Sequence, residues 1–162
     1  MKIAVGGDSA GSNLAAVVCL NARSAKSYMP KFQWLIYPAT NMNMVTASHT
    51  AFAEGYFLTR ALMSFFQGLY LSSPDDKNDW RASPLLADSL GGLPPALIQT
   101  AGFDPLKDEG KAYADRMNNE GSNAQYTDYE GMVHGFVNLG GVIDKAGECV
   151  NEGVSAMRKA LS

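Results

Sequence analysis

Short apolar runs alternate along this chain with stretches in which apolar residues recur at the spacing of a helix. The runs that predict buried strands lie at residues 3–5, 32–37, 96–100 and about 124–129. The stretches that predict helices lie at residues 14–20, 107–119 and 145–161. Buried strands that alternate with helices are typical of a parallel sheet covered on both faces. The pattern therefore predicts an α/β fold with a mostly parallel sheet of about four strands and flanking helices.

Residues 41–80 interrupt this alternation. A short helical stretch is expected at residues 48–53, and Thr59 is suited to cap a second helix in which Leu62, Phe66 and Tyr70 recur at helical spacing. An aromatic and methionine stripe of this kind is usually plain core. Because the segment breaks an otherwise regular plan, it is also a candidate for a helical lid over a pocket.

Composition narrows the class of protein. A chain of 162 residues with 46% apolar content is expected to form one domain, residues 1–162, with a real core. Its 13 basic and 16 acidic residues form no basic cluster, which argues against nucleic acid and anionic membranes as partners. No apolar run is long enough to span a bilayer. Cys19 and Cys149 lie far apart, which favours packing thiols in a reducing, cytoplasmic compartment.

The motif Gly7-Asp8-Ser9-Ala10-Gly11 follows the first predicted strand and precedes a helix that is apolar on nearly every side. It fits the G-x-S-x-G nucleophile elbow, in which a strained serine stands at the tip of a strand-to-helix turn. Gly7 and Gly11 then leave room for the tight packing around the serine. Five such residues also occur in ordinary turns. As an elbow, they would expose the Ser9 hydroxyl and aim the Ala10 amide at an oxyanion.

A nucleophilic serine needs a base and an acid that orients the base. Asp104 follows the third predicted strand and His134 follows the fourth, so both are expected at the sheet edge that carries Ser9. The order Ser, Asp, His is that of an α/β-hydrolase. Asp104 is equally suited to a turn before proline, and Asp108 is a rival acid. His134 could be a solvated loop residue, and the other histidine, His49, lies in the presumed lid.

Together these motifs resemble the hormone-sensitive-lipase-like family of α/β-hydrolases, the bacterial esterases with a G-D-S-A-G elbow. The matching segments are residues 7–11 with 13–15, 37–38, 55–59, 83–85, 93–96, 104–110 and 134–136. The resemblance implies Ser9 as nucleophile, His134 as general base and acid, and Asp104 as the orienting carboxylate. It also implies hydrolysis of carboxylic esters, usually with short acyl chains, without a metal or an organic cofactor.

The chain departs from the family pattern in two ways. Ser12 stands where the family commonly has glycine, a change that a helix is expected to tolerate but that could crowd the acyl side of the site. Family members also carry the first strands and an H-G-G-G-type loop before the elbow, and this chain contains no H-G-G-G. The resemblance therefore implies a truncated α/β-hydrolase fold, the C-terminal half. The elbow strand would then lie at an open sheet edge, which predicts a homo-oligomer that pairs residues 2–6.

The leading interpretation is a serine carboxylesterase that acts on a small ester through an acyl-enzyme. Ala10 would supply an oxyanion-hole amide, and the candidate pocket residues are Phe57, Phe65, Phe66 and Trp80. A catalytically impaired fragment that serves as a binding or assembly module is the alternative from another class. Hydrolysis of another acyl bond, such as an amide, is also open.

Overall fold

The computed structural model describes residues 2–162, and its core is a four-stranded parallel sheet. The strands are β1 (Ala4–Asp8), β2 (Phe32–Ile36), β3 (Ala96–Phe103) and β4 (Ala124–Val133). Their order in the sheet is their order in the sequence, β1-β2-β3-β4, and every neighbouring pair is parallel. The predicted fold class is confirmed, and β1 lies at an edge as expected.

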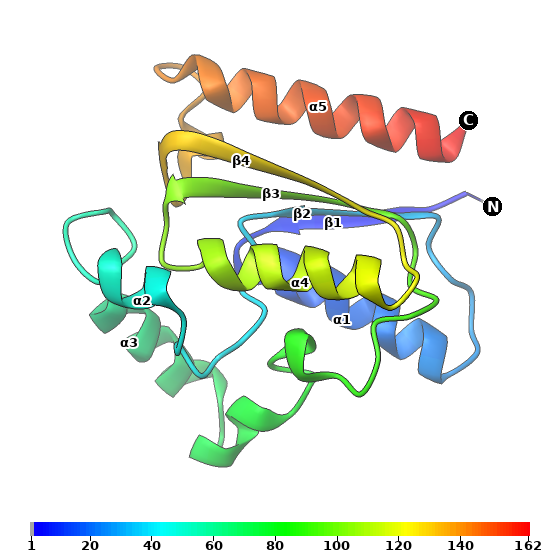
Figure 1. Cartoon of the computed structure of the whole chain (residues 1–162), viewed down its shortest axis with the longest axis horizontal. Coiled ribbons are helices and arrows are strands. Elements are labelled where there is room, and N and C mark those ends of the chain that lie inside the picture. Colours follow the sequence, from blue (N-terminus) through cyan, green and yellow to red (C-terminus); the bar gives the residue numbers. More distant parts are fainter. Residues whose placement is uncertain (1) are drawn as a thin grey trace.

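Helices cover both faces of the sheet (Figure 1). Helices α1 (Ala10–Ser24) and α4 (Lys107–Asn119) lie on one face, and α5 (Asp144–Leu161) lies on the other. Leu35 belongs to the core beneath α1 and α4, whereas its neighbour Ile36 belongs to the core beneath α5. This alternation follows from the two-residue period of a strand. Strand β3 is buried from Ala96 to Gly102, as a strand covered on both faces should be.

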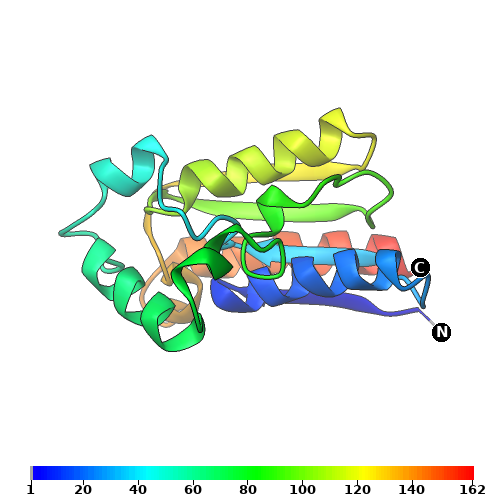
Figure 2. The ribbon, with the colours of Figure 1, turned by 90° about the horizontal axis from the view of Figure 1, so that it is seen from below.

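The segment between β2 and β3 lies at one end of the sheet. It contains α2 (Ala47–Ala51), α3 (Arg60–Tyr70) and the 3-10 turns η1 (Pro74–Asn78) and η2 (Pro84–Leu86). Figure 2 shows α2 and α3 beyond the end of the strands, with both chain termini at the opposite end. The Thr59 hydroxyl accepts the Leu62 amide at 3.1 Å, so the predicted cap of α3 is confirmed.

Two expectations about element boundaries and burial were wrong. The fourth strand does not end at Tyr129, because the β3–β4 ladder resumes after an irregularity and pairs Phe103 with Val133. Helix α1 is not buried on every side, since Leu14 is 54% exposed and Val18 is 47% exposed. The sheet covers only one side of α1, and an apolar pattern alone does not show whether a second layer covers the other.

Candidate active site

The turn between β1 and α1 holds Ser9 in a strained conformation. Its φ is 54° and its ψ is −117°, a region that non-glycine residues rarely adopt. The Ser9 amide donates to the Ile36 carbonyl at 2.9 Å, which ties the turn to β2. A Cβ on Gly7 would lie 2.5 Å from the Gly11 carbonyl carbon, so only glycine fits there. Gly11 itself has open space at its Cβ position, so the expectation of crowding at that residue was wrong.

Ser9, His134 and Asp104 form a continuous hydrogen-bonded array. The Ser9 Oγ lies 2.9 Å from His134 Nε2, and His134 Nδ1 lies 2.7 Å from Asp104 Oδ2. Asp104 is fully buried, and His134 is only 7% exposed. Each distance is within the range for a hydrogen bond. The structure thus brings together the three residues that the sequence placed at the ends of three strands.

The Asp104 carboxylate is held on both oxygens, since its Oδ1 also accepts the Leu106 amide at 2.8 Å. The rival acid, Asp108, lies elsewhere on the same loop and helix. Its Oδ2 accepts the amide of Ser48 in α2, at 2.8 Å. Geometry therefore pairs Asp104, and not Asp108, with the imidazole.

The imidazole of His134 packs against the ring of Tyr37, with ring centroids 4.5 Å apart. The Tyr37 hydroxyl donates to Asp8 Oδ2 at 3.3 Å, and the Asn138 amide reaches the same oxygen at 3.3 Å. Burial, and then the charge of Asp8, raise the pKa of the Tyr37 hydroxyl, so it remains a neutral donor. These contacts hold the Tyr37 ring in place, and the ring in turn supports the imidazole of His134.

A cavity of about 670 Å³ opens beside Ser9 and is lined mainly by apolar side chains. This volume lies within the usual range for small-molecule sites. Ser9, Ala10 and His134 border the cavity, and Phe57 and Phe66 also line it. Most of the remaining lining comes from the segment between β2 and β3, including Met42, Met44, Leu58, Leu62 and Met63.

Two of the candidate pocket residues lie outside this lining. Phe65 is 59% exposed, because neighbouring residues in a helix point about 100° apart and Phe66 faces the cavity instead. Trp80 packs against the core beneath α1 and α4. Ser12 is tolerated in α1, and the alternative of crowding is not found: its Oγ accepts the Ile36 amide at 2.8 Å and lies 2.6 Å from the Gly7 carbonyl. Ser12 therefore braces the elbow from within and does not crowd the cavity.

Sequence reasoning assigned no role to Glu109 and mentioned His49 only as the second histidine, yet both line the cavity. The two residues lie 60 positions apart, and no local pattern connects them. Residues 2–162 contain no cluster of three or more His, Cys, Asp or Glu side chains that could hold a metal ion. In the same part of the chain, none of the helices combines the length and apolar character needed to cross a bilayer.

A parallel sheet that places a strained serine after one strand, and an acid and a histidine after later ones, defines the α/β-hydrolase class. The chain belongs to this family: a family model described as alpha/beta hydrolase fold matches residues 1–138. Similar proteins and similar solved structures include several named as esterases, in agreement with the resemblance to the hormone-sensitive-lipase-like branch.

Among curated relatives, the carboxylic ester hydrolase LipN of Mycobacterium tuberculosis is 45% identical over 166 residues, covering 99% of this chain and 44% of the relative. The ethyl acetate hydrolase of Pseudomonas putida is 32% identical, with 99% and 51% covered. The chain thus spans about half the length of these relatives.

Solved structures give the same result. EstE1, a thermostable carboxylesterase from a metagenomic library, matches with a TM-score of 0.95 and 48% identity, covering 99% of this chain and 55% of that one. An esterase from Pyrobaculum calidifontis matches with a TM-score of 0.93 and 41% identity, covering 99% and 53%.

Proposed function

We propose that this chain hydrolyses small carboxylic esters with short acyl groups through a serine acyl-enzyme. The observation that carries the proposal is the array in which His134 lies 2.9 Å from Ser9 and 2.7 Å from the buried Asp104. The apolar cavity beside Ser9 supports a small uncharged substrate. The esterase names of the relatives support the same bond type.

In the proposed reaction, Ser9 Oγ attacks the ester carbonyl carbon while His134 Nε2 takes the serine proton. Asp104 keeps the imidazole oriented and stabilises the imidazolium. The tetrahedral oxyanion accepts a hydrogen bond from the Ala10 amide, one of the first-turn amides that have no acceptor within α1. His134 then protonates the leaving alcohol. A water activated by His134 hydrolyses the acyl-enzyme and releases the acid.

The oxyanion site limits the expected rate. Ala10 is the one amide that we assign to it, and loss of a single oxyanion donor typically reduces turnover by about 10²- to 10³-fold. We therefore expect slow hydrolysis by this chain alone. Addition of a partner that supplies a second donor should raise kcat more than it lowers KM, because the oxyanion forms only in the transition state.

We assign a lid role to residues 41–80, since this segment contributes most of the cavity lining. Its outer surface also carries apolar side chains, with Phe65 at 59% and Leu69 at 73% exposed. An exposed apolar surface of this kind is suited to contact with a partner chain. Tyr70 is 57% exposed and lines the cavity, so its substitution by serine should raise KM for longer acyl chains while leaving the folded state intact.

The proposal includes a homo-oligomer that forms through β1. Within residues 2–162, β1 pairs only with β2, which leaves its other edge open. Leu14 and Val18 are exposed apolar residues of α1, which packs against β1. Open edges of this kind favour pairing with another chain. Sedimentation should find a dimer at micromolar concentration, and a monomer with a sharp thermal transition would contradict this part of the proposal.

A cytoplasmic location completes the proposal. Cys19 and Cys149 are both free and buried, and burial raises the pKa of each thiol to about 12. Such thiols act as packing groups and need no oxidising compartment. Cell fractionation with an antibody against the chain would test the location.

The deciding experiment compares the purified chain with Ser9→Ala in the hydrolysis of p-nitrophenyl acetate and butyrate. Activity that disappears in the variant supports the acyl-enzyme proposal. Equal traces from both proteins would contradict it and favour a binding or assembly module. If the matching anilides were cleaved faster than the esters, the preferred bond would be an amide and the ester proposal would be wrong.

A further inference from the structure

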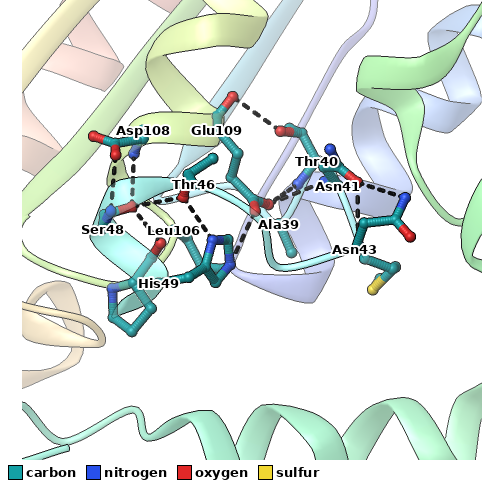
Figure 3. A network of polar contacts seen from close by, with 12 residues as sticks. Ala39, Thr40, Asn41, Asn43, Thr46, Ser48, His49, Leu106, Asp108 and Glu109 are labelled. Atoms are coloured by element: carbon teal, nitrogen blue, oxygen red, sulfur yellow. Dashed lines mark hydrogen bonds and ion pairs between the residues drawn. The ribbon is translucent and has the colours of Figure 1, made fainter. Parts of the chain in front are cut away.

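The cavity beside Ser9 is bordered by a second acid and imidazole pair, formed by His49 of α2 and Glu109 of α4. His49 Nε2 lies 3.2 Å from Glu109 Oε2, and the two residues are 1% and 0% exposed (Figure 3). This is an ion-pair distance without the alignment of a hydrogen bond, and neither atom has another polar partner among the described residues. Buried polar groups of this kind are costly unless they engage one another.

The other carboxylate oxygen of Glu109 holds the cavity wall. Glu109 Oε1 accepts the amides of Thr40 at 2.5 Å and Asn41 at 3.0 Å, as Figure 3 shows. We call residues 39–44 the wall segment, because Ala39, Asn41, Met42 and Met44 line the cavity. Glu109 therefore ties the wall segment to α4.

The wall segment also contacts the elbow. The Asn13 side chain donates to the Ala39 carbonyl at 2.8 Å, and the Ala39 amide lies 3.5 Å from the Ser9 carbonyl. A shift of the wall segment would thus change the shape of the cavity beside the Ser9 hydroxyl. Small displacements of this kind can cost large factors in rate, because attack requires a defined geometry.

The far side of His49 is also engaged. His49 Nδ1 lies 2.6 Å from the Thr46 hydroxyl, which contacts the Ser48 hydroxyl at 3.0 Å. The Ser48 hydroxyl donates to the Pro105 carbonyl at 2.7 Å, next to Asp104. We count as the protons of the pair the one on the Glu109 carboxyl and the second one on the His49 ring. With one of these protons present, or with neither, His49 has a protonation form in which every contact to Thr46 and Glu109 joins a donor to an acceptor.

A second proton removes that compatibility. Oε1 of Glu109 already accepts two amides, so the proton of a neutral carboxyl is placed on Oε2, which lies 3.2 Å from His49 Nε2. If Nε2 is also protonated, two donors face each other across 3.2 Å with no acceptor between them. The contact between α2 and α4 is then unfavourable.

The surroundings place this second protonation below the ordinary histidine pKa of 6.5. Burial raises the pKa of Glu109 to about 8, against the opposing effect of the Asn41 and Thr40 amides. Burial also lowers the pKa of His49 from its ordinary 6.5. Arg60 of α3 lowers that pKa further, while Asp104 and Asp108 on the α4 side oppose the shift.

We propose that His49 and Glu109 are a positioning pair that holds the wall segment beside Ser9 and releases it when the pair takes up a second proton. The assignment of the wall to a substrate pocket rests on the proposed function. The pair touches no reacting atom, so its effect passes through the position of residues 39–44.

Amide hydrogen exchange of the full 162-residue chain tests the proposal without substrate. After correction for intrinsic exchange rates, protection of the Thr40 and Asn41 amides should fall about fivefold or more from about pH 7 to about pH 4, because the pKa of His49 lies below its ordinary value. In His49→Gln, which cannot take up the second proton, protection should stay constant over this range. Asp115→Asn, a change at an exposed site of α4, should behave like the wild type.

Equal protection of the wild-type amides at both pH values would overturn the proposal, and this comparison needs no variant to fold. A His49→Gln protein that loses protection in parallel with the wild type would also overturn it. Because exchange requires no hydrolysis, an inactive chain that shows the expected loss of protection would contradict the proposed function alone. If the chain is active, acid should raise KM in the wild type and not in His49→Gln.

Discussion

Asp104 and His134 meet at 2.7 Å in a part of the site where the carboxylate has no exposed surface. This contact selects the tautomer in which His134 carries its proton on Nδ1, so that Nε2 is free to accept the proton of Ser9. The proposed function of the imidazole therefore depends on a carboxylate that water does not reach.

Replacement of that charge gives the first prediction. Asp104→Asn preserves the size of the side chain but favours the wrong tautomer, and we expect kcat/KM for p-nitrophenyl butyrate to fall by about 10⁴-fold near neutral pH. Asp108→Asn is the matched control, because Asp108 contacts α2 and not His134. A larger loss in the control than in Asp104→Asn would show that the acid has been assigned wrongly.

The second prediction concerns the packing of α5 on the sheet. A Cβ at Gly153 would lie 1.9 Å from Cζ2 of Trp34, whose indole is fixed by a 2.7 Å hydrogen bond to Gln99. We expect Gly153→Ala to destabilise the fold by about 1–3 kcal/mol in urea denaturation. Gly147, in the same helix, has open space at its Cβ position. Gly147→Ala should be neutral or stabilising by about 0.5 kcal/mol, and equal losses in both variants would contradict the argument.

The third prediction is a pH dependence of stability from Glu109. Its pKa is raised to about 8 in the folded state from an ordinary 4.5, so the folded chain retains a proton that the unfolded chain releases. Stability from this group is full below about pH 4.5 and is lost as the pH rises towards 8. His49 acts in the opposite direction: because its pKa is lowered, stability from this group is present above its ordinary 6.5 and is lost as the pH falls below that value.

Thermal unfolding between about pH 6.5 and 8 therefore isolates Glu109. The wild type should lose stability across this range, whereas Glu109→Gln, which cannot ionise and keeps an acceptor for the Thr40 and Asn41 amides, should lose less. His49→Gln should retain the wild-type decline. Identical pH profiles of the wild type and Glu109→Gln would show that the carboxyl is already ionised at pH 6.5.

The fourth prediction concerns Ser12 behind the elbow. Its hydroxyl is fully buried and bridges the Ile36 amide and the Gly7 carbonyl. Ser12→Ala leaves these backbone groups unsatisfied, and we expect a loss of about 1–3 kcal/mol in unfolding free energy. The catalytic rate per folded molecule should change little, since the side chain does not line the cavity. A variant as stable as the wild type would mean that water replaces the hydroxyl.

The sequence was sufficient for the order of elements and for the end of the sheet at which Ser9, Asp104 and His134 meet. The apolar runs predict the order of the elements. The rule that the carboxyl ends of parallel strands lie at one edge of a sheet predicts where the three residues meet. Helix Lys107–Asn119 matches its predicted range, because its helical pattern lies between two clear strands.

The remaining features depend on contacts that no local pattern encodes. The His49–Glu109 pair joins two helices distant in sequence. The sequence shows only that Ser12 replaces a common glycine, whereas the hydrogen bond from the Ile36 amide to its hydroxyl depends on the fold. Phe65 and Phe66 are neighbours of the same residue type, and only the rotation of α3 about its axis decides which of them faces the cavity.

The sheet has its strands in chain order, so Ser9 follows one edge strand and His134 follows the other. The array is therefore complete only when both edge strands have joined the sheet. The 2.9 Å contact between these residues bridges 125 positions of sequence. The reactivity of Ser9 would thus report whether the whole sheet is assembled, including the strand farthest from it.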